Sequence, residues 1–301
     1  MVRSISMTFL RVRFLLITLQ VKYVLEPKDS GEKRRRLSSL PQSPTDAYHG
    51  VIDRMTPDDI QFARRILGWV LHAQRILTMP ELQEALAIEI GVASLNQQDI
   101  TGAEEIISTC GGFVDHNQDS DLVTFSHETV RPFLEEHEFK SLPSHSVLCK
   151  TCLTYLQLPP FEKPCKRQDS DQRQVEFKLG NYAATFWANH AVQCEREFEL
   201  ETTILETFRS DGRREAMEQL SDHYYTQRKS LLHVLIEARL TFIFASPLSN
   251  DEAVARMHVS ILNWANSKFS KSNCGKEHQR QGRVRSSAPA LRSQGRRFAG
   301  C

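Results

Sequence analysis

The sequence predicts a mainly α-helical protein in which a winged-helix module with a short β-hairpin is followed by an α-helical domain. Three capped helical stretches end in a hairpin between residues 56 and 125, which is the order of elements in a winged helix. From residue 144 onward, apolar residues recur only at helical spacing. With 301 residues and 40% hydrophobic content, the chain can fill the cores of about two domains.

These patterns divide the chain into five regions. The winged-helix domain is expected over residues 47–140 and the helical domain over residues 144–270. Residues 1–25 form a first helix, and residues 26–46 form a charged connector. Residues 271–301 are basic and lack apolar periodicity, so we expect a disordered tail there.

The first two helices of the module are marked by their N-terminal caps. Thr56 precedes Pro57, whose missing N–H costs nothing at the first helical position, and two acids complement the positive helix end. An apolar stripe follows, made of Ile60, Ala63, Leu67, Val70 and Leu71. Thr78 and Glu81 form a capping box, because the carboxylate can reach back to the Thr78 amide. A second, short helix should begin there.

A third helical stretch, about residues 101–110, should end at two glycines that begin with Gly111, because glycine tolerates the left-handed conformation of a helix end. Residues 113–116 and 122–125 flank a turn-rich segment and predict a β-hairpin. A further helix from about Thr129 would pack behind it. Helical spacing in the second domain predicts helices near 145–158, 174–192, 195–209, 213–226, 230–245 and 250–268.

Charge is segregated along the chain, although the net charge is only +1. Residues 1–40 carry 9 basic and 3 acidic side chains, and residues 271–301 carry 8 basic and 1 acidic. Residues 41–270 carry 33 acidic and 21 basic side chains. Because phosphate backbones and anionic lipids are bound by Lys and Arg, this acidic body disfavours nucleic acid and membrane surfaces as partners.

The acidic excess is greatest in the winged-helix module. No Lys or Arg occurs between Arg75 and Arg131. The same stretch holds ten acids: Glu81, Glu84, Glu89, Asp99, Glu104, Glu105, Asp115, Asp119, Asp121 and Glu128. Winged helices often read DNA, but these carboxylates would repel phosphates, so we expect no DNA binding through this module.

No metal-ligating residue is assigned. Cys149 and Cys152 have a spacing that can clasp zinc or exchange a disulfide. However, they share one helix face with Leu153 and Leu156, which favours buried thiols that pack as small apolar groups. We expect no cofactor: the Gly-Lys pair at Gly275 lacks the earlier glycine of a phosphate-binding loop, so ATP and GTP binding are not expected.

No catalytic residue is assigned, and we expect no enzyme. Ser126, His127 and Glu128 have the residue types of a hydrolase triad, but sequence neighbours cannot form the required relay. We expect His127 to pack and to form hydrogen bonds at the exit from the hairpin instead. The helical surfaces are not expected to bind a small molecule.

Compartment is indicated by cysteine usage and by the N-terminus. Seven irregularly spaced cysteines are unlike a secreted disulfide scaffold and favour a reducing, cytoplasmic compartment. The apolar run at residues 14–19 is far short of the roughly 20 residues of a membrane span. The arginines before Glu26 leave a mitochondrial presequence as an alternative.

Several segments together resemble the region after the NTPase core in fungal NACHT proteins of the STAND class. Residues 75–87 are similar to the signature Arg-Pro-Leu-Thr-Leu-x-Glu-Leu-x-Glu-Ala-Leu of the winged helix in that class. Residues 125–134 resemble its His-x-Ser-Val-x-x-Phe-Leu segment, with Thr129 in place of serine. Residues 9–14 resemble its late helix Phe-Leu-Trp-Val-Arg, with Arg11 in place of tryptophan.

The resemblance covers roughly residues 5–195 and implies a function. It implies that residues 1–25 are a remnant helix of the NACHT core. It also implies a winged helix of the kind named after GPI inositol-deacylase, a name that refers to a resemblance and implies no hydrolase activity. In this class the winged-helix and helical segments fold over a nucleotide domain and hold it inactive, and ankyrin repeats often follow. Residues 231–240 are faintly similar to an ankyrin start, but the Thr-Pro and a clear second copy are missing, so no array is assigned and the sequence leaves open whether one follows.

We therefore expect a non-catalytic regulatory or protein-interaction module of a NACHT/STAND-type signalling protein, without the nucleotide-binding P-loop. Its expected partners are other protein domains, such as a NACHT core or a repeat-containing protein. The sequence leaves open whether these residues belong to a longer protein. The alternative is a nucleic-acid-associated protein that binds through its basic tails.

Overall fold

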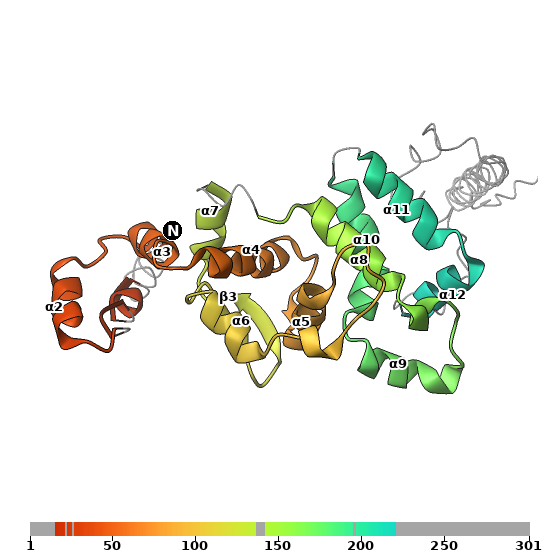
Figure 1. Ribbon diagram of the computed structural model, residues 1–301, viewed down its shortest axis with the longest axis horizontal. Helices are drawn as coiled ribbons and strands as arrows, with labels where there is room; N and C mark the ends of the chain where they lie inside the picture. Colours follow the sequence, from red (N-terminus) through yellow and green to blue (C-terminus); the bar gives the residue numbers. More distant parts are fainter. Residues whose placement is uncertain (1–15, 22, 26, 137–141, 195–196, 221–301) are drawn as a thin grey trace, which may run out of the picture. The chain divides into compact units, whose positions relative to one another are not determined.

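The computed structural model describes residues 16–21, 23–25, 27–136, 142–194 and 197–220. All of these described residues lie in one compact unit. Figure 1 shows the described elements, which are mostly helices with one small sheet. None of the described helices is long and apolar enough to cross a membrane.

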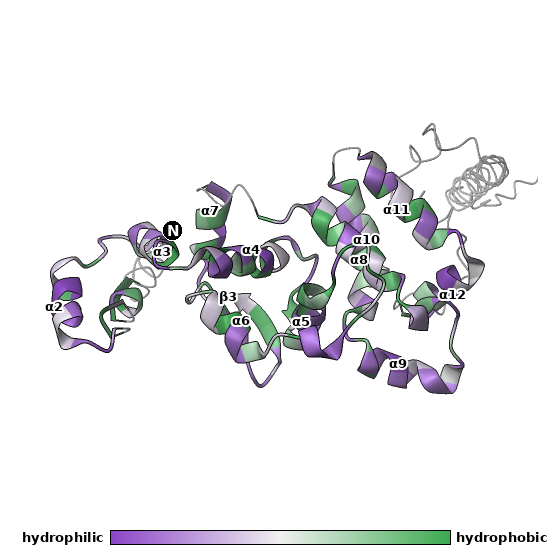
Figure 2. Ribbon diagram, in the orientation of Figure 1, coloured by the Kyte–Doolittle hydropathy of each residue, from purple (hydrophilic) through white to green (hydrophobic). Residues whose placement is uncertain are grey.

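The N-terminal part is more helical than the sequence predicts. Residues 16–21 are helical, as expected for the first helix, although residues 1–15 lie outside the described part. The expected connector, residues 26–46, contains the nine-residue helix α2 (Ser30–Ser38), which begins because the Asp29 carboxylate accepts a hydrogen bond from the Glu32 amide. Helix α2 has no buried residue, and its side chains are almost all hydrophilic (Figure 2). Arg36 connects α2 to the N-terminal helix: it donates to the Tyr23 carbonyl at 2.8 Å and lies over the Tyr23 ring.

Two capped helices open the winged-helix module. Helix α3 (Pro44–Ile52) begins with a complete capping box at Ser43. Helix α4 (Pro57–His72) begins at Thr56, whose hydroxyl accepts from the Asp59 amide, as the sequence predicts. The predicted stripe of α4 is confirmed at Ala63, Leu67 and Leu71, which are buried, whereas Ile60 and Val70 are half-buried.

The predicted capping box of the next helix is also confirmed. Helix α5 (Met79–Ala87) begins at Thr78, which bonds to the Glu81 amide while the Glu81 carboxylate accepts from the Thr78 amide. A 3₁₀ turn (Gln97–Asp99) leads to helix α6 (Ala103–Thr109). Helix α6 ends before Gly111 and Gly112, which have φ angles of 56° and 96°.

The hairpin is part of a three-stranded antiparallel sheet with the order β1-β3-β2. Strands β2 (Val114–Asn117) and β3 (Leu122–Phe125) form the predicted hairpin, and Val114 faces Phe125 in the register. The third strand, β1 (Leu77–Thr78), was not predicted. It is only two residues long, which is too short to show a sequence pattern.

The core of the module joins α3 to the hairpin and to helix α7 (Val130–Glu136), the helix that the sequence predicts after the hairpin. The ring centroid of Tyr48, on α3, lies 5.1 Å from that of Phe113 and 5.0 Å from that of Phe133, on α7. All three rings are buried. The predicted winged-helix order is thus present, and α3 belongs to its core.

The second region is wholly helical in its described part, as the sequence predicts. It comprises α8 (His145–Leu156), α9 (Ser170–Glu176), α10 (Gly180–Val192), α11 (Phe198–Phe208) and α12 (Asp211–Leu220). Helices α8 and α10 lie side by side (Figure 1). Both carry many apolar residues (Figure 2), and the core extends to α11 through Trp187 and Phe208, whose centroids are 4.7 Å apart.

One helix prediction in this region is wrong. The single helix expected over 174–192 is two helices, α9 and α10, which are separated by residues 177–179. The Phe177 ring packs edge-on against Phe161 at 5.2 Å, and the Leu179 amide donates to a side chain of the winged helix. The Leu179 amide thus bonds to the Glu84 side chain instead of a helical carbonyl, and the chain leaves the helix here. The helices expected at 230–245 and 250–268 and the tail at 271–301 lie outside the described residues, as does the end of the one expected at 213–226.

Candidate functional site

The surface of α6 and the hairpin is acidic. Glu104 and Glu105 are exposed on the first turn of α6, and Asp115 and Asp119 are exposed on the hairpin. We call these four side chains the acidic surface. Since residues 76–130 contain no Lys or Arg, no cation from this stretch compensates their charge. The surface would repel the phosphates that the equivalent elements of DNA-binding winged helices contact.

Three of the ten acids counted in the sequence have other roles. Glu81 caps α5 and pairs with Arg75, with 2.5 Å between Nη2 and Oε1. Glu84 is only 4% exposed. Asp121, at a left-handed φ of 58°, places Oδ1 2.7 Å from Nε2 of His116 across the hairpin. The remaining seven are exposed: Glu89, Asp99, Glu104, Glu105, Asp115, Asp119 and Glu128.

Glu84 connects the winged helix to the helical region. Its Oε2 accepts a hydrogen bond from the Tyr155 hydroxyl at 2.6 Å and another from the Leu179 amide at 2.8 Å. Burial, together with the negative charge of Glu84, raises the pKa of Tyr155, so the phenol stays a neutral donor. A buried carboxylate with two donors is costly to disrupt, so α5 is held against α8 and α10.

Arg75 provides a second connection between the two regions. Its guanidinium pairs with Glu81 and lies 5.3 Å from the ring centroid of Tyr182, on α10. The Tyr182 hydroxyl accepts a hydrogen bond from the Gln74 amide at 3.0 Å. We call the contact made by these residues and by Glu84 the junction. Because its polar groups are mutually satisfied, the junction couples the two regions rather than offering a binding site.

The two cysteines weighed as zinc ligands are buried on α8, as the helix-face argument predicts. Cys149 and Cys152 are 0% exposed, and the Cys149 thiol donates to the Trp187 carbonyl at 3.4 Å. Burial raises the pKa of both thiols well above the usual value. Such thiols are weak nucleophiles and poor metal ligands. Across the residues that the structure describes, no group of three or more His, Cys, Asp or Glu side chains could hold a metal ion.

The Ser126-His127-Glu128 segment has a structural role in the fold. The Ser126 hydroxyl donates to the Gly112 carbonyl at 2.7 Å. His127 Nδ1 accepts from the Thr129 amide at 3.2 Å, and Thr129 Oγ1 lies 2.9 Å from the Tyr48 hydroxyl. The prediction that His127 forms hydrogen bonds at the exit from the hairpin is confirmed. These contacts fix the turn into α7.

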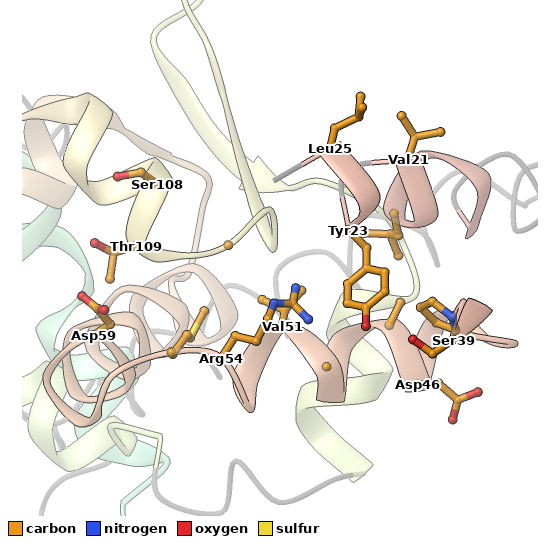
Figure 3. A pocket seen from close by; sticks show the side chains of 16 residues that line it. Val21, Tyr23, Leu25, Ser39, Asp46, Val51, Arg54, Asp59, Ser108 and Thr109 are labelled. Atoms are coloured by element: carbon orange, nitrogen blue, oxygen red, sulfur yellow. The ribbon is translucent and has the colours of Figure 1, made fainter. Parts of the chain in front are cut away.

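A groove of about 990 Å³ lies between the N-terminal helix, α3 and the end of α6. Figure 3 shows Tyr23 and Val21 on one side of it, and Ser108 and Thr109 on the other. The sequence did not predict this groove, because its walls come from three segments that are far apart in the chain. Its lining combines apolar side chains with seven polar or charged ones: Tyr23, Ser39, Asp46, Arg54, Asp59, Ser108 and Thr109.

Comparison with known proteins finds a family similarity for the first module. Residues 54–144 match the family model described as "GPI inositol-deacylase, winged helix domain". The chain is 22% identical over 195 residues to "Azaphilone pigments biosynthesis cluster protein L" of Monascus ruber, an alignment that covers 58% of this chain and 40% of that protein. The chain thus spans less than half the length of this relative. No solved structure matches the chain.

Proposed function

We propose that this chain is a non-catalytic protein-interaction module of a NACHT/STAND-type signalling protein, and that the acidic surface of its winged helix contacts partner domains. The observation that carries the proposal is the exposure of Glu104, Glu105, Asp115 and Asp119 on the elements that other winged helices use for DNA. Partners with basic surfaces fit this charge, and phosphates do not.

The family match and the junction support a regulatory role. The match to a winged-helix family model covers the acidic surface and α4 to α7. The junction couples this module to the helical region through Glu84, so a partner on one could affect the other. The proposal places the protein in the cytoplasm and gives it no catalytic step, no nucleotide and no metal.

Neutralisation of the acidic surface tests the proposal. Proximity labelling in cells that express the full chain should identify protein neighbours that are lost from the variant Glu104→Gln, Glu105→Gln, Asp115→Asn, Asp119→Asn. A control variant should keep them; it neutralises four exposed acids elsewhere, at Asp53, Glu162, Asp171 and Glu176. Equal labelling by all three proteins, or tight ATP binding in calorimetry, contradicts the proposal.

The second candidate function is nucleic-acid binding through the basic tail. It is favoured by the 8 basic and 1 acidic side chains of residues 271–301. A gel shift at low salt separates the two proposals. We expect no retention of duplex DNA by the full chain, whereas retention that disappears on deletion of residues 271–301 would favour the tail.

A further inference from the structure

Three histidines meet at the junction, where the end of α4 contacts the helical region. His190, on α10, is fully buried, and its Nδ1 lies 2.9 Å from Nδ1 of His145 at the start of α8. The ring centroid of His72, on α4, lies 4.7 Å from that of His145. His72 and His145 are half-buried. The cluster therefore joins the winged helix to two helices of the second region.

A hydrogen-bond chain links the neutral cluster to Tyr182 and Gln74. The Gln74 amide donates to the Tyr182 hydroxyl, which lies 2.9 Å from Nε2 of His190. When the phenol donates to Nε2, His190 carries its proton on Nδ1 and donates to His145 Nδ1. Each of the three hydrogen bonds then has one donor and one acceptor, and no ring carries a charge.

Protonation of both His145 and His190 is incompatible with this arrangement. If His145 and His190 are both charged, each Nδ1 carries a hydrogen, and two donors face each other across 2.9 Å. The two positive charges also repel in a site from which water is largely excluded. The rings must then separate, and the attachment of α4 to α8 and α10 must weaken.

The groups around the cluster do not offset this charge. Arg131, on α7, disfavours the charged form of His72, and Glu135 favours it. However, Glu135 is itself paired with Arg131 at 3.5 Å. The other charged or titratable groups that face the cluster and Tyr182 are Arg75, Glu81, Cys152 and Cys194. Since Glu81 is paired with Arg75, no unpaired carboxylate among these described groups is available to neutralise a protonated imidazole.

We propose that His72, His145 and His190 make the attachment of the winged helix to the helical region sensitive to protons, so that acidification below about pH 6.5 releases it. The chemical effector is the proton, and the two arrangements are the closed junction described above and an open one. This inference does not depend on which protein binds the acidic surface.

The pH range follows from the direction of the pKa shifts. Burial, with His145 and His72 nearby, lowers the pKa of His190 to about 3, and burial also lowers the pKa of His145 and His72. An unfolded histidine takes up its proton near pH 6.5. The stability contributed by the neutral rings is therefore complete above about pH 6.5 and is lost progressively as the pH falls below it.

Urea unfolding of the full chain at pH 7.5 and pH 5.5 tests the size of the effect. Each histidine that stays neutral should lower the folding constant about 10-fold between these pH values. The variant His145→Gln, His190→Gln should lack this part of the pH dependence. The control Glu104→Gln, Glu105→Gln changes two exposed side chains, leaves every histidine in place and should keep the wild-type ratio. Equal pH dependence in the wild type and the double variant would overturn the proposal.

Amide exchange tests where the change occurs. After correction for intrinsic rates, the Gln74 amide, which bonds across the junction, should lose protection at pH 5.5. The Ser126 amide, which bonds to Phe113 inside the winged helix, should keep it. Equal loss at both amides means global unfolding and contradicts a release of the junction. If the double variant does not fold, an NMR titration of the wild-type imidazoles decides, and a His190 that titrates near pH 6.5 overturns the proposal.

Discussion

The acidic surface and the junction use the same residue type in opposite ways. Glu104 and Glu105 are exposed on α6, whereas Glu84 is 4% exposed and accepts two hydrogen bonds from the helical region. A carboxylate exposed to water can bind another protein, whereas a buried carboxylate must be hydrogen-bonded within the fold to offset the cost of its burial. The difference teaches that a count of acids in the sequence overstates the charge that the winged helix presents.

The largest expected effect is at Glu84. The substitution Glu84→Ala leaves the Tyr155 hydroxyl and the Leu179 amide without their acceptor, and should lower the free energy of unfolding by about 2–4 kcal/mol. Urea unfolding at pH 7.5 measures it. The matched control Glu104→Ala should change stability by less than about 0.5 kcal/mol. If both variants changed the free energy of unfolding by similar amounts, the buried and the exposed glutamate would not differ in their contribution to stability.

A steric prediction concerns the close approach of α4 to the segment that leads into α8. A Cβ at Gly68 would lie 2.6 Å from Cδ of Pro143, so Gly68→Ala should cost about 1–3 kcal/mol through overpacking. At Gly50, on α3, a Cβ would meet only the flexible end of Arg54 at 3.3 Å. Gly50→Ala should be neutral or stabilising by up to about 1 kcal/mol. Thermal unfolding compares the two, and an equal melting temperature would contradict the close packing.

A smaller effect is expected from a helix cap. Thr78→Ala removes the capping box that begins α5, the helix that carries Glu84, and should cost about 1 kcal/mol in urea unfolding. Asp29→Ala removes the cap of α2, which has no buried residue, so it should fray α2 with little effect on global unfolding. A larger global loss from Asp29→Ala would show that α2 is coupled to the core.

The smallest effect on stability is expected on the acidic surface itself. The double variant Glu104→Gln, Glu105→Gln should unfold within about 0.5 kcal/mol of the wild type, because both side chains are exposed. Circular dichroism and urea unfolding check this. A marked loss of stability would mean that these carboxylates have a structural role, and would weaken the proposal that they contact partners.

Much of the winged helix could be predicted from local sequence. The caps at Thr56 and Thr78 and the helix end before Gly111 depend on contacts within a few residues, and all three are present in the structure. The acidic character of the module was predicted in part, because seven of the ten acids counted in the sequence are exposed. The remaining three depend on partners that local patterns do not reveal, such as Tyr155, which is 71 residues from Glu84.

The sequence by itself determined the mainly helical class, the hairpin and the excess of carboxylates on the module, because helix caps, glycine stops and charge act locally. Tertiary structure decided which carboxylates are buried, where the helix expected over 174–192 divides, and that three histidines meet at the junction. These outcomes depend on contacts such as that of His145 with His190, 45 residues apart, or of Glu84 with Leu179, 95 residues apart. Such contacts form only when separate helices pack, and packing is set by the shape and burial of whole faces rather than by neighbouring residues.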